Sequence, residues 1–426
     1  MDMTTTPISK LLFKMSPPVM LALLIQSVYN IVDSFFVAQY LPEGLTALSI
    51  IYPMQLLMIA LATGTGVGVN LLIARMDGEG EKTKQATVMT NGFILNVMHC
   101  LIFAAGGILF SSVYFHMSSG NEKVCELGIV YAQIVFGGSL GLFVESICTK
   151  ILQARGNMTL PMLAQVAGAM INVILDPILI FGYAGMPRMG IAGAAIASVI
   201  GQWAAMLITF ISVFRAYRIN GKFNFRMCWQ IYRNGIGSIV TQSLYTLYIV
   251  GLNLILKLFT EDAVTVLGIY YKVQSFFFIP LLGFQQVLLP IISNNFGAGK
   301  TERIRQIVKF TIVLSSGVML IATLIFMIFP QVLLSVFSSE QALIDIGIYA
   351  FRVIALSFIP AGITIVVTSY LQGITKMRAS VFIIVLRQVI LLVPLAFLLH
   401  FIGLKAVWWT FPITEIIASI VCFITI

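Results

Sequence analysis

Charged side chains are scarce in this sequence and make up only 10% of its 426 residues. Soluble domains carry roughly 25% charged residues, so this chain cannot cover a surface that faces water. Hydrophobic residues account for 59% of the chain and recur in long runs, and about 20 apolar residues cross a bilayer as one helix. The composition therefore excludes a soluble globule and predicts an integral membrane protein.

Motifs for metal binding and for disulfides are missing as well. The five cysteines form no Cys-x-x-Cys pair and the three histidines are isolated, which argues against a zinc site or a disulfide framework. His-Glu-x-x-His does not occur. Gly-x-Ser-x-Gly occurs at residues 137–141, but it lies inside the hydrophobic run 125–149 rather than at a strand-to-helix turn. We therefore expect no enzyme, and the gaps between the runs are too short for the selectivity loop of a channel. The net charge of +9 lies in those gaps, so no nucleic-acid partner is expected.

Twelve hydrophobic runs predict twelve membrane-spanning helices, and the basic residues test that number. The runs cover residues 11–39, 46–74, 88–115, 125–149, 158–182, 190–214, 230–256, 264–295, 306–329, 344–372, 379–400 and 403–425. When the gaps are assigned alternately to the two sides, eighteen of the 25 Lys and Arg residues fall on one side and four on the other. Cytoplasmic loops are enriched in Lys and Arg, so both termini are predicted to face the cytoplasm from the cell membrane.

The second half of the sequence repeats the first. At a shift of 219 residues, a polar and apolar pattern recurs: Thr46, Leu48, Ile50, Tyr52 and Gln55 become Thr265, Leu267, Ile269, Tyr271 and Gln274. A shift of six helices preserves direction, so we predict an all-α membrane fold of two parallel, pseudo-symmetric six-helix lobes. The N-lobe covers residues 1–214, a cytoplasmic linker 215–229 and the C-lobe 230–426. Such duplication is typical of transporters that rock two lobes about a cavity.

Asp33 is the first candidate functional residue, because an ionisable side chain inside a bilayer is expensive and usually functional. Gln26, Tyr29 and Asp33 follow one another by three and four positions, so they share one face of the first helix. Asn30 belongs to the same polar segment. The alternative is a structural carboxylate that is satisfied within its lobe.

Asp176 is the second candidate and lies in the fifth helix. Asn172 precedes it by four positions and so shares its face. Pro177 cannot donate to the carbonyl of Val173, which is left free. Oxygen atoms from Asp33, Asp176 and Asn172 would suit a shared proton or a hard cation. We predict that these three form an ion-coupling site, and a metal site only if the ion is sodium. A packing network inside the lobe is the alternative.

Proline and glycine predict where helices bend and where they pack closely. Pro17 and Pro18 remove two backbone donors from the first helix, so we expect a hinge there, and Pro177 predicts another in the fifth helix. The spacing of Gly64 and Gly68 is the Gly-x-x-x-Gly pattern, which in membrane helices indicates close packing against a neighbour.

Five further ionisable side chains fall within the hydrophobic runs, and we predict structural roles for them. Glu145 and Lys272 are expected near helix ends, where they can reach water. Arg352, Arg387 and Glu415 are expected to pair with one another or to line the second lobe.

With these residues the chain resembles the multidrug and toxic compound extrusion (MATE) family, in its DinF-like and MepA-like branch. The resemblance rests on Asn30–Asp33, on Asn172–Gly182 (NVILDPILIFG) and on Asn295–Lys300 (NFGAGK). It implies a twelve-helix, V-shaped antiporter that exports amphipathic, often cationic, compounds in exchange for protons or sodium ions. It also implies that Asp33 and Asp176 are the ion-coupling carboxylates.

The resemblance further implies that Gln26, Tyr29 and Asn30 line the cavity for cargo. The expected partners are small lipophilic or cationic molecules and the lipid bilayer, with a monomeric chain and no cofactor beyond the coupling ion. Some family members carry essential acids in the seventh, eighth and tenth helices, whereas this chain has none in the seventh, Lys272 in the eighth and only Asp345, near the outer end, in the tenth. Coupling is therefore expected to rest on the first lobe.

Two other transporter classes remain as alternatives. A flippase for lipid-linked or oligosaccharide cargo, from the same broader superfamily, would be favoured by a basic cavity, because such cargo carries phosphate. A major-facilitator transporter also has two parallel six-helix halves. Its second loop normally carries an Asp-Arg-Gly-Arg pattern, whereas this loop begins with the sequence at 75–78, Arg-Met-Asp-Gly.

Overall fold

The chain is almost entirely helical in the computed structural model, which describes residues 2–425. Met1 and Ile426, the outer ends of the predicted lobes, lie outside the described residues, as do the side chains of Pro42 and of Lys82, one of the eighteen basic residues counted above. The elements are α1 (Ile8–Tyr40), α2 (Pro42–Gly78), α3 (Lys82–Ser118), α4 (Glu122–Gly137), α5 (Leu140–Ala154), α6 (Thr159–Phe181), η1 (Tyr183–Gly185), α7 (Ile191–Ala216), α8 (Phe225–Lys257), α9 (Glu261–Gly297), α10 (Thr301–Ile328), α11 (Pro330–Ser335), α12 (Gln341–Ala355), α13 (Phe358–Gly373), α14 (Met377–Val385), η2 (Leu386–Leu391), α15 (Leu392–His400), α16 (Leu404–Val407) and α17 (Thr410–Thr425).

The number of membrane spans agrees with the sequence. Among the described residues, ten helices are long and apolar enough to cross a membrane, and two bent pairs bring the number to twelve. The pairs are α4 with α5, bent by 44°, and α12 with α13, bent by 45°. No strand occurs between residues 2 and 425. The predicted all-α membrane fold with twelve spans is therefore confirmed.

Local sequence explains where several helices begin and end. Asn121 precedes α4, and its side-chain oxygen accepts from the backbone N–H of Lys123 at 3.1 Å. The hydroxyl of Thr260 caps α9 in the same way, accepting from the N–H of Ala263 at 3.1 Å. Both satisfy donors that have no partner within the helix. At the end of α6, Gly182 adopts the left-handed conformation (φ 80°), which glycine enters without steric penalty.

Packing divides the described chain into two units, which we call the N-unit and the C-unit. The N-unit contains residues 17–239, and the C-unit contains residues 2–16 together with residues 240–425. The chain passes from one unit to the other twice, at Ser16–Pro17 inside α1 and at Ile239–Val240 inside α8. The predicted lobe boundaries at residues 214 and 230 follow the order of the helices and stay a prediction.

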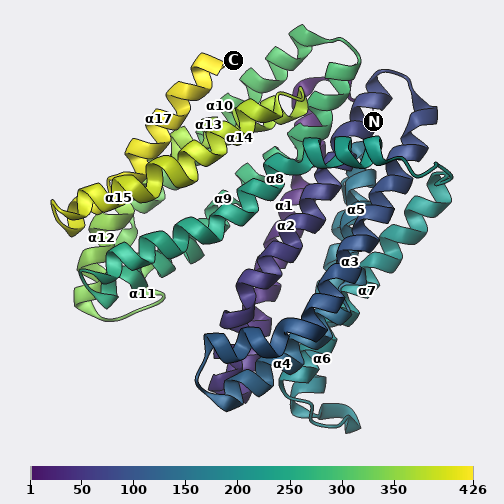
Figure 1. Cartoon of the computed structure of the whole chain (residues 1–426). Helices are drawn as coiled ribbons and strands as arrows, with labels where there is room; N and C mark the ends of the chain where they lie inside the picture. Colours follow the sequence, from purple (N-terminus) through teal and green to yellow (C-terminus); the bar gives the residue numbers. More distant parts are fainter. Residues whose placement is uncertain (1, 426) are drawn as a thin grey trace. The chain divides into compact units, whose positions relative to one another are not determined.

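Close helix contacts shape the N-unit. Helix α7 packs against α5 and α6, and α2 packs against α3 and α5 (Figure 1). A Cβ atom on Gly168 would lie 2.6 Å from the carbonyl oxygen of Gly201, and the reverse distance is the same. Only glycine lets the backbones of α6 and α7 approach so closely. This contact brings the polar faces of the two helices together.

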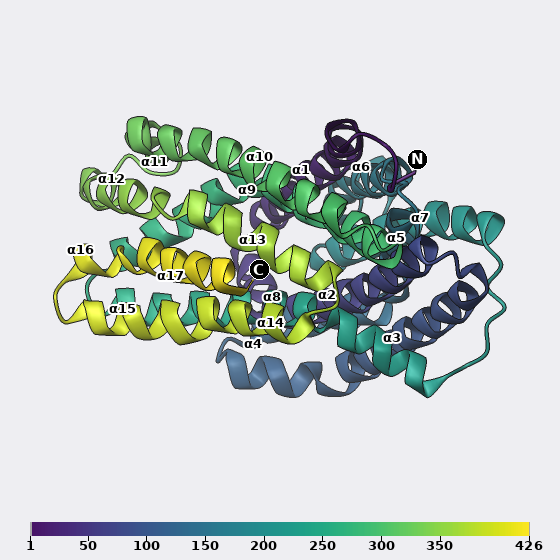
Figure 2. The same cartoon turned by 90° about the horizontal axis from the view of Figure 1, so that it is seen from above.

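Aromatic side chains fill the C-unit. Helix α13 packs against α9, α10 and α17, and α17 lies between α13 and the α14–α15 segment (Figure 2). Phe326 is fully buried and stacks on Phe351 with ring centroids 5.2 Å apart. Phe358 meets Phe326 edge to face at 5.0 Å. Such pairs are a favoured arrangement of aromatic rings.

Candidate functional site

The N-unit contains a cavity of about 650 Å³. Side chains from α1, α2, α4, α5, α6 and α7 line it. Of the residues predicted from sequence, five lie in its wall: Gln26, Tyr29, Asn30, Asp33 and Asn172. Pockets of about 300–1,000 Å³ hold drug-sized ligands, so the cavity has room for one molecule of that size.

Asp176 lies behind this wall rather than in it. Its side chain is fully buried. The amide of Asn172 bridges it to the cavity, donating to Asp176 Oδ1 at 3.4 Å and to the hydroxyl of Ser198 at 3.2 Å. Asp33 lies close enough to Asp176 for their charges to interact. The structure therefore brings Asp33, Asn172 and Asp176 together, with one carboxylate at the cavity and the other one layer deeper.

Several oxygen atoms around this group have no hydrogen-bond partner within the described part of the chain. They are buried acceptors: Asp33 Oδ1, Asn172 Oδ1, Asp176 Oδ2 and Gln202 Oε1. Buried polar atoms without a partner are rare and call for a ligand, an ion or water. Carboxylate and amide oxygens are the ligands that hard cations prefer. The group therefore has the chemistry to hold a proton or a small hard cation.

The three predicted hinge prolines all lie inside helices. Pro17 and Pro18 occur in α1, and Pro177 occurs in α6 directly after Asp176. Pro177 has no N–H, so it cannot donate to the carbonyl of Val173 one turn earlier. Pro17 also begins the N-unit segment of α1.

Glu145 corrects the sequence interpretation. We expected it near a helix end, but it lies on α5 in the cavity wall. Its Oε1 atom accepts a hydrogen bond from the Thr149 hydroxyl at 2.6 Å and another from the amide of Gln165 at 3.5 Å. The spacing of Glu145 and Thr149 on one helical face was the available signal. The cavity wall thus carries two carboxylates, Asp33 and Glu145, and no Lys, Arg or His among its described residues.

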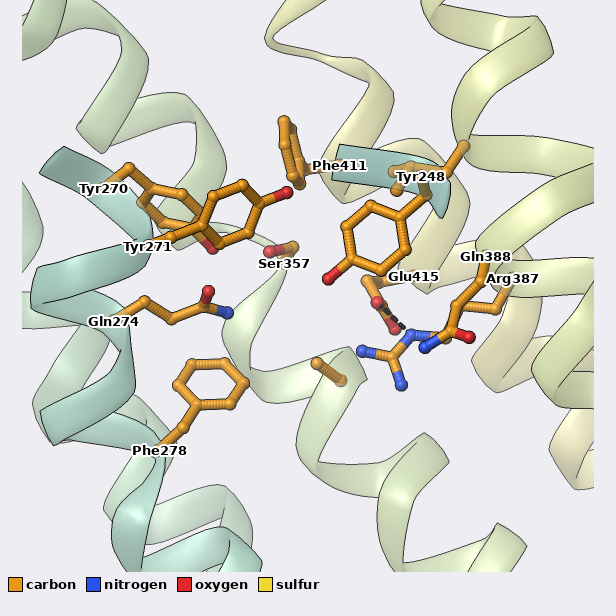
Figure 3. A pocket seen from close by; sticks show the side chains of 12 residues that line it. Tyr248, Tyr270, Tyr271, Gln274, Phe278, Ser357, Arg387, Gln388, Phe411 and Glu415 are labelled. Carbon is orange, nitrogen blue, oxygen red and sulfur yellow. Dashed lines mark hydrogen bonds and ion pairs between the residues drawn. The ribbon is translucent and has the colours of Figure 1, made fainter. Parts of the chain in front are cut away.

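The C-unit contains a second, much smaller polar pocket of about 40 Å³ (Figure 3). Arg387 and Glu415 form an ion pair in its wall, in agreement with the expected pairing of these charges. Tyr248 lies beside the pair, and Tyr270 and Tyr271 line the other side of the pocket. A water needs roughly 10–15 Å³, so the pocket has room for a few waters and not for a drug.

The remaining predicted charges lie at the surface of the helices. Lys272 is exposed, but it is the twelfth residue of the 37-residue α9, so the expectation that it lies near a helix end is wrong. Arg352 is also exposed, and its Nε atom donates to the backbone carbonyl of Met327 at 3.2 Å. Within residues 2–425, no group of three or more His, Cys, Asp or Glu side chains could hold a metal ion. A sodium site would therefore depend on amide and carbonyl oxygens beside the two aspartates.

Sequence comparison identifies one matching family. A family model described as MatE matches residues 18–178 and again residues 238–398. The two matches begin 220 residues apart, in agreement with the 219-residue shift of the internal repeat. Together they cover about three quarters of the chain.

Relatives and solved structures resemble the chain over nearly its whole length. A FAD transporter of Shewanella oneidensis is 26% identical over 429 residues, covering 98% of this chain and 94% of the relative. The multidrug export protein MepA of Staphylococcus aureus strain MRSA252 is 24% identical over 431 residues, covering 99% and 94%.

Among solved structures, one match is a multidrug resistance MATE family transporter of the MOP superfamily in an outward-facing conformation. Its TM-score is 0.92 at 22% sequence identity, and the match covers 99% of this chain and 96% of that one. A MOP superfamily transporter from Pyrococcus furiosus, described by the reverse polarity of its binding pocket, matches with a TM-score of 0.91 at 23% identity over 99% and 96%. At such identities these structures indicate the fold alone.

Proposed function

Because the chain belongs to the MATE family of membrane transporters, in its MepA-like branch, we propose that it exports amphipathic cations in exchange for protons or sodium ions. The observation that carries this proposal is the polarity of the N-unit cavity. Its wall holds Asp33 and Glu145, with Asp176 behind it, and no basic side chain among the described residues. A cation of drug size would find both volume and counter-charge there.

Competition for the same carboxylates would couple cargo to the driving ion. While Asp33 and Asp176 are charged, a cationic cargo is attracted to the cavity. A proton or sodium ion that binds between them neutralises part of this charge, so the cargo loses its counter-charge and leaves. The cargo then favours the charged state of the carboxylates, whereas the bound ion favours the neutralised state. Exchange requires that the two ligands prefer opposite states in this way. Pro17 and Pro18 would provide the hinge in α1.

The membrane potential limits what each cycle can achieve. Moving one charge down 100 mV supplies about 2.3 kcal/mol, which sustains roughly a forty-fold cargo gradient at 1.4 kcal/mol per tenfold. If a monovalent cationic cargo is exchanged for one ion, the potential cancels. Only the chemical gradient of the ion then drives export.

An anionic cargo fits the cavity poorly. One relative is described as a FAD transporter, and both a dinucleotide and the lipid-linked cargo of a flippase carry phosphate. Phosphate would meet Asp33 and Glu145 without a basic partner in the described cavity wall, and such like-charge contacts are unfavourable. We therefore favour a cation. The proposed location is the cytoplasmic membrane, with both termini in the cytoplasm and a monomeric chain.

The first experiment measures export of a fluorescent cationic dye from proteoliposomes, with proton and sodium gradients applied separately. Asp33→Asn and Asp176→Asn should each lower export at least about ten-fold, equivalent to ~1.4 kcal/mol, because an amide cannot exchange charge with the ion. Asp345→Asn is the matched control, since Asp345 is exposed on α12, and it should export normally. Full export by both cavity variants, folded as judged by size-exclusion chromatography, would rule out the proposed coupling.

A further inference from the structure

The segment that joins α7 to α8 and the start of α8 carry an unusual combination of side chains. Between residues 215 and 233 there are five basic residues and no acidic one. Three aromatic side chains among them are largely exposed: Phe225 by 77%, Trp229 by 64% and Phe223 by 60%. We call this set the basic platform; its basic members, all exposed, are Arg215, Arg218, Lys222, Arg226 and Arg233.

Hydrogen bonds to α3 hold the backbone of the platform in place. The N–H of Gly221 donates to the Thr90 hydroxyl at 3.0 Å, and the Asn91 amide donates to the carbonyl of Lys222 at 3.0 Å. Asn91 Oδ1 in turn accepts from the N–H of Asn224 at 2.8 Å. A Cβ atom on Gly221 would lie only 2.4 Å from the Cα atom of Thr87. The backbone is therefore seated against α3 and not free to turn its side chains inward.

Packing of α8 fixes which of its side chains face outward. Cys228 and Ile231 are buried, and a Cβ atom on Gly235 would lie 2.1 Å from the carbonyl oxygen of Gly64 on α2. These three residues follow the three-and-four spacing of one helical face. The opposite face therefore presents Arg226, Trp229 and Arg233, all of which are exposed.

Basic residues at neighbouring helix ends differ because they have acidic partners. Arg75 pairs with Glu79 at 2.8 Å, and Arg155 pairs with Asp77 at 2.7 Å. Arg155 also lies over the ring of Tyr217, 5.2 Å from its centroid, beside the platform. No ion pair involves a basic platform residue in the part of the chain that the structure describes. Their charges are available to an outside partner.

We propose that the basic platform binds the headgroups of anionic phospholipids in the cytoplasmic leaflet. The platform lies where two membrane-spanning helices end, on the side that the Lys and Arg distribution predicts to be cytoplasmic. Basic clusters beside spans attract anionic lipids, and exposed tryptophan is favoured at headgroup depth. A soluble acidic partner would account for the charges but not for three exposed aromatic rings between them, so the lipid is the better fit.

Fluorescence quenching of Trp229 tests this assignment. The full chain is reconstituted in phosphatidylcholine vesicles that contain equal fractions of either brominated phosphatidylglycerol or brominated phosphatidylcholine. The difference between the unmodified chain and Trp229→Phe isolates the signal of Trp229. We expect brominated phosphatidylglycerol to associate with the platform at least about five-fold more strongly than brominated phosphatidylcholine does, which is the effect of one basic contact. Raising NaCl from 50 to 500 mM should remove this preference, because salt screens exposed charges.

Two variants that remove the same charge test whether the lipid preference comes from the basic platform or from the net charge of the whole chain. Lys222→Gln, Arg226→Gln and Arg233→Gln combined should lower the preference at least about five-fold, because three of the five basic contacts are lost while Arg215 and Arg218 remain. The control combines Arg305→Gln, Lys309→Gln and Arg378→Gln, which removes the same charge from exposed positions of the C-unit and should keep the preference. Equal quenching by both lipids in the unmodified chain, a preference that survives high salt, or one that the platform variant leaves unchanged would each overturn the proposal. The salt series uses only the unmodified chain and decides the question even if the variant fails to fold.

Discussion

Glycines show what a single residue decides in this molecule. A Cβ atom on Gly68 would lie 2.1 Å from the carbonyl oxygen of Ile231, and one on Gly64 would lie 2.2 Å from Cγ1 of Ile239. The spacing of Gly64 and Gly68 had predicted close packing without indicating the partner. The structure identifies that partner as α8. Spacing reveals that a helix face is flat, whereas only the folded chain reveals what lies on it.

Replacing Gly68 with alanine should lower the thermal stability of the protein. The added methyl group meets backbone rather than a movable side chain, and such overpacking typically costs about 1–3 kcal/mol. Gly106→Ala in α3 is the control, because nothing lies within 4 Å of its Cβ position, and it should be neutral or slightly stabilising. Equal melting temperatures of Gly68→Ala and the unmodified protein in one detergent would contradict the contact.

Glu145 should influence cargo affinity more than ion dependence. Its carboxylate lies in the cavity wall and is held by Thr149 and Gln165. Glu145→Gln removes a counter-charge, so the apparent KM for a cationic dye should rise about five-fold, the loss of ~1 kcal/mol. The dependence on proton or sodium gradient should stay as it is. Dye export at graded dye concentrations measures the KM and the dependence on the ion gradient. Glu126→Gln, on the exposed face of α4, is the control. An unchanged KM for Glu145→Gln would show that Glu145 takes no part in cargo binding.

At the scale of elements, the sequence predicted all twelve membrane-spanning segments but not every bend within them. Hydrophobic runs located the helices because lipid requires about 20 apolar residues per crossing. The 45° bend between α12 and α13 has a local signal: Pro360 lies in the first turn of α13, where its missing N–H is tolerated. The bend between α4 and α5 coincides with Gly137 and Gly138. A glycine pair permits a bend without requiring it, so its presence alone was not decisive.

The element η2 is a further feature that sequence did not predict. It is a π-helix over Leu386–Leu391, and it carries Arg387 and Gln388. Pro394 follows in α15 and cannot donate to the carbonyl of Ile390. The wider π-turn accommodates this missing bond and directs Arg387 toward Glu415 (Figure 3). Pro394 can be read from the sequence, but the ion pair of Arg387 also requires Glu415, whose position is set by the packing of α17.

Breaking the pair between η2 and α17 should destabilise the C-unit. Glu415→Gln leaves Arg387 without its counter-charge in a largely buried site, and loss of one partner of a buried pair costs up to about 3–5 kcal/mol. Arg387→Met with Glu415→Leu should restore most of that stability, since apolar replacements of buried pairs are often neutral. Thermal unfolding in detergent measures both variants. A double variant less stable than the single one would show that the pair itself stabilises the fold.

At the scale of the whole chain, the two halves share their bends but not their charges. Bent spans occur at equivalent places in both halves, with angles of 44° and 45°. Pro394 occupies in the second half the role that Pro177 has in the first, yet Val393 stands where Asp176 would be. Duplication thus preserved the helices, while the second copy has no counterpart of Asp33 or Asp176. The sequence could locate these acids, because charge in a lipid-soluble segment is conspicuous. It could not reveal that Asp176 lies behind Asn172, which depends on the contact of α6 with α7.

The passage of α1 between the two units has a consequence for biosynthesis. The first residues belong with the C-unit, where the carbonyl of Met3 accepts from the Asn295 amide at 3.1 Å and that of Thr4 accepts from Lys300 at 3.0 Å. Asn295 leaves the ribosome 292 residues after Met3, which at 5–20 residues per second is a delay of roughly 15–60 s. The N-terminal segment therefore spends most of translation without its final contacts, and the two ends of α1 mature at very different times.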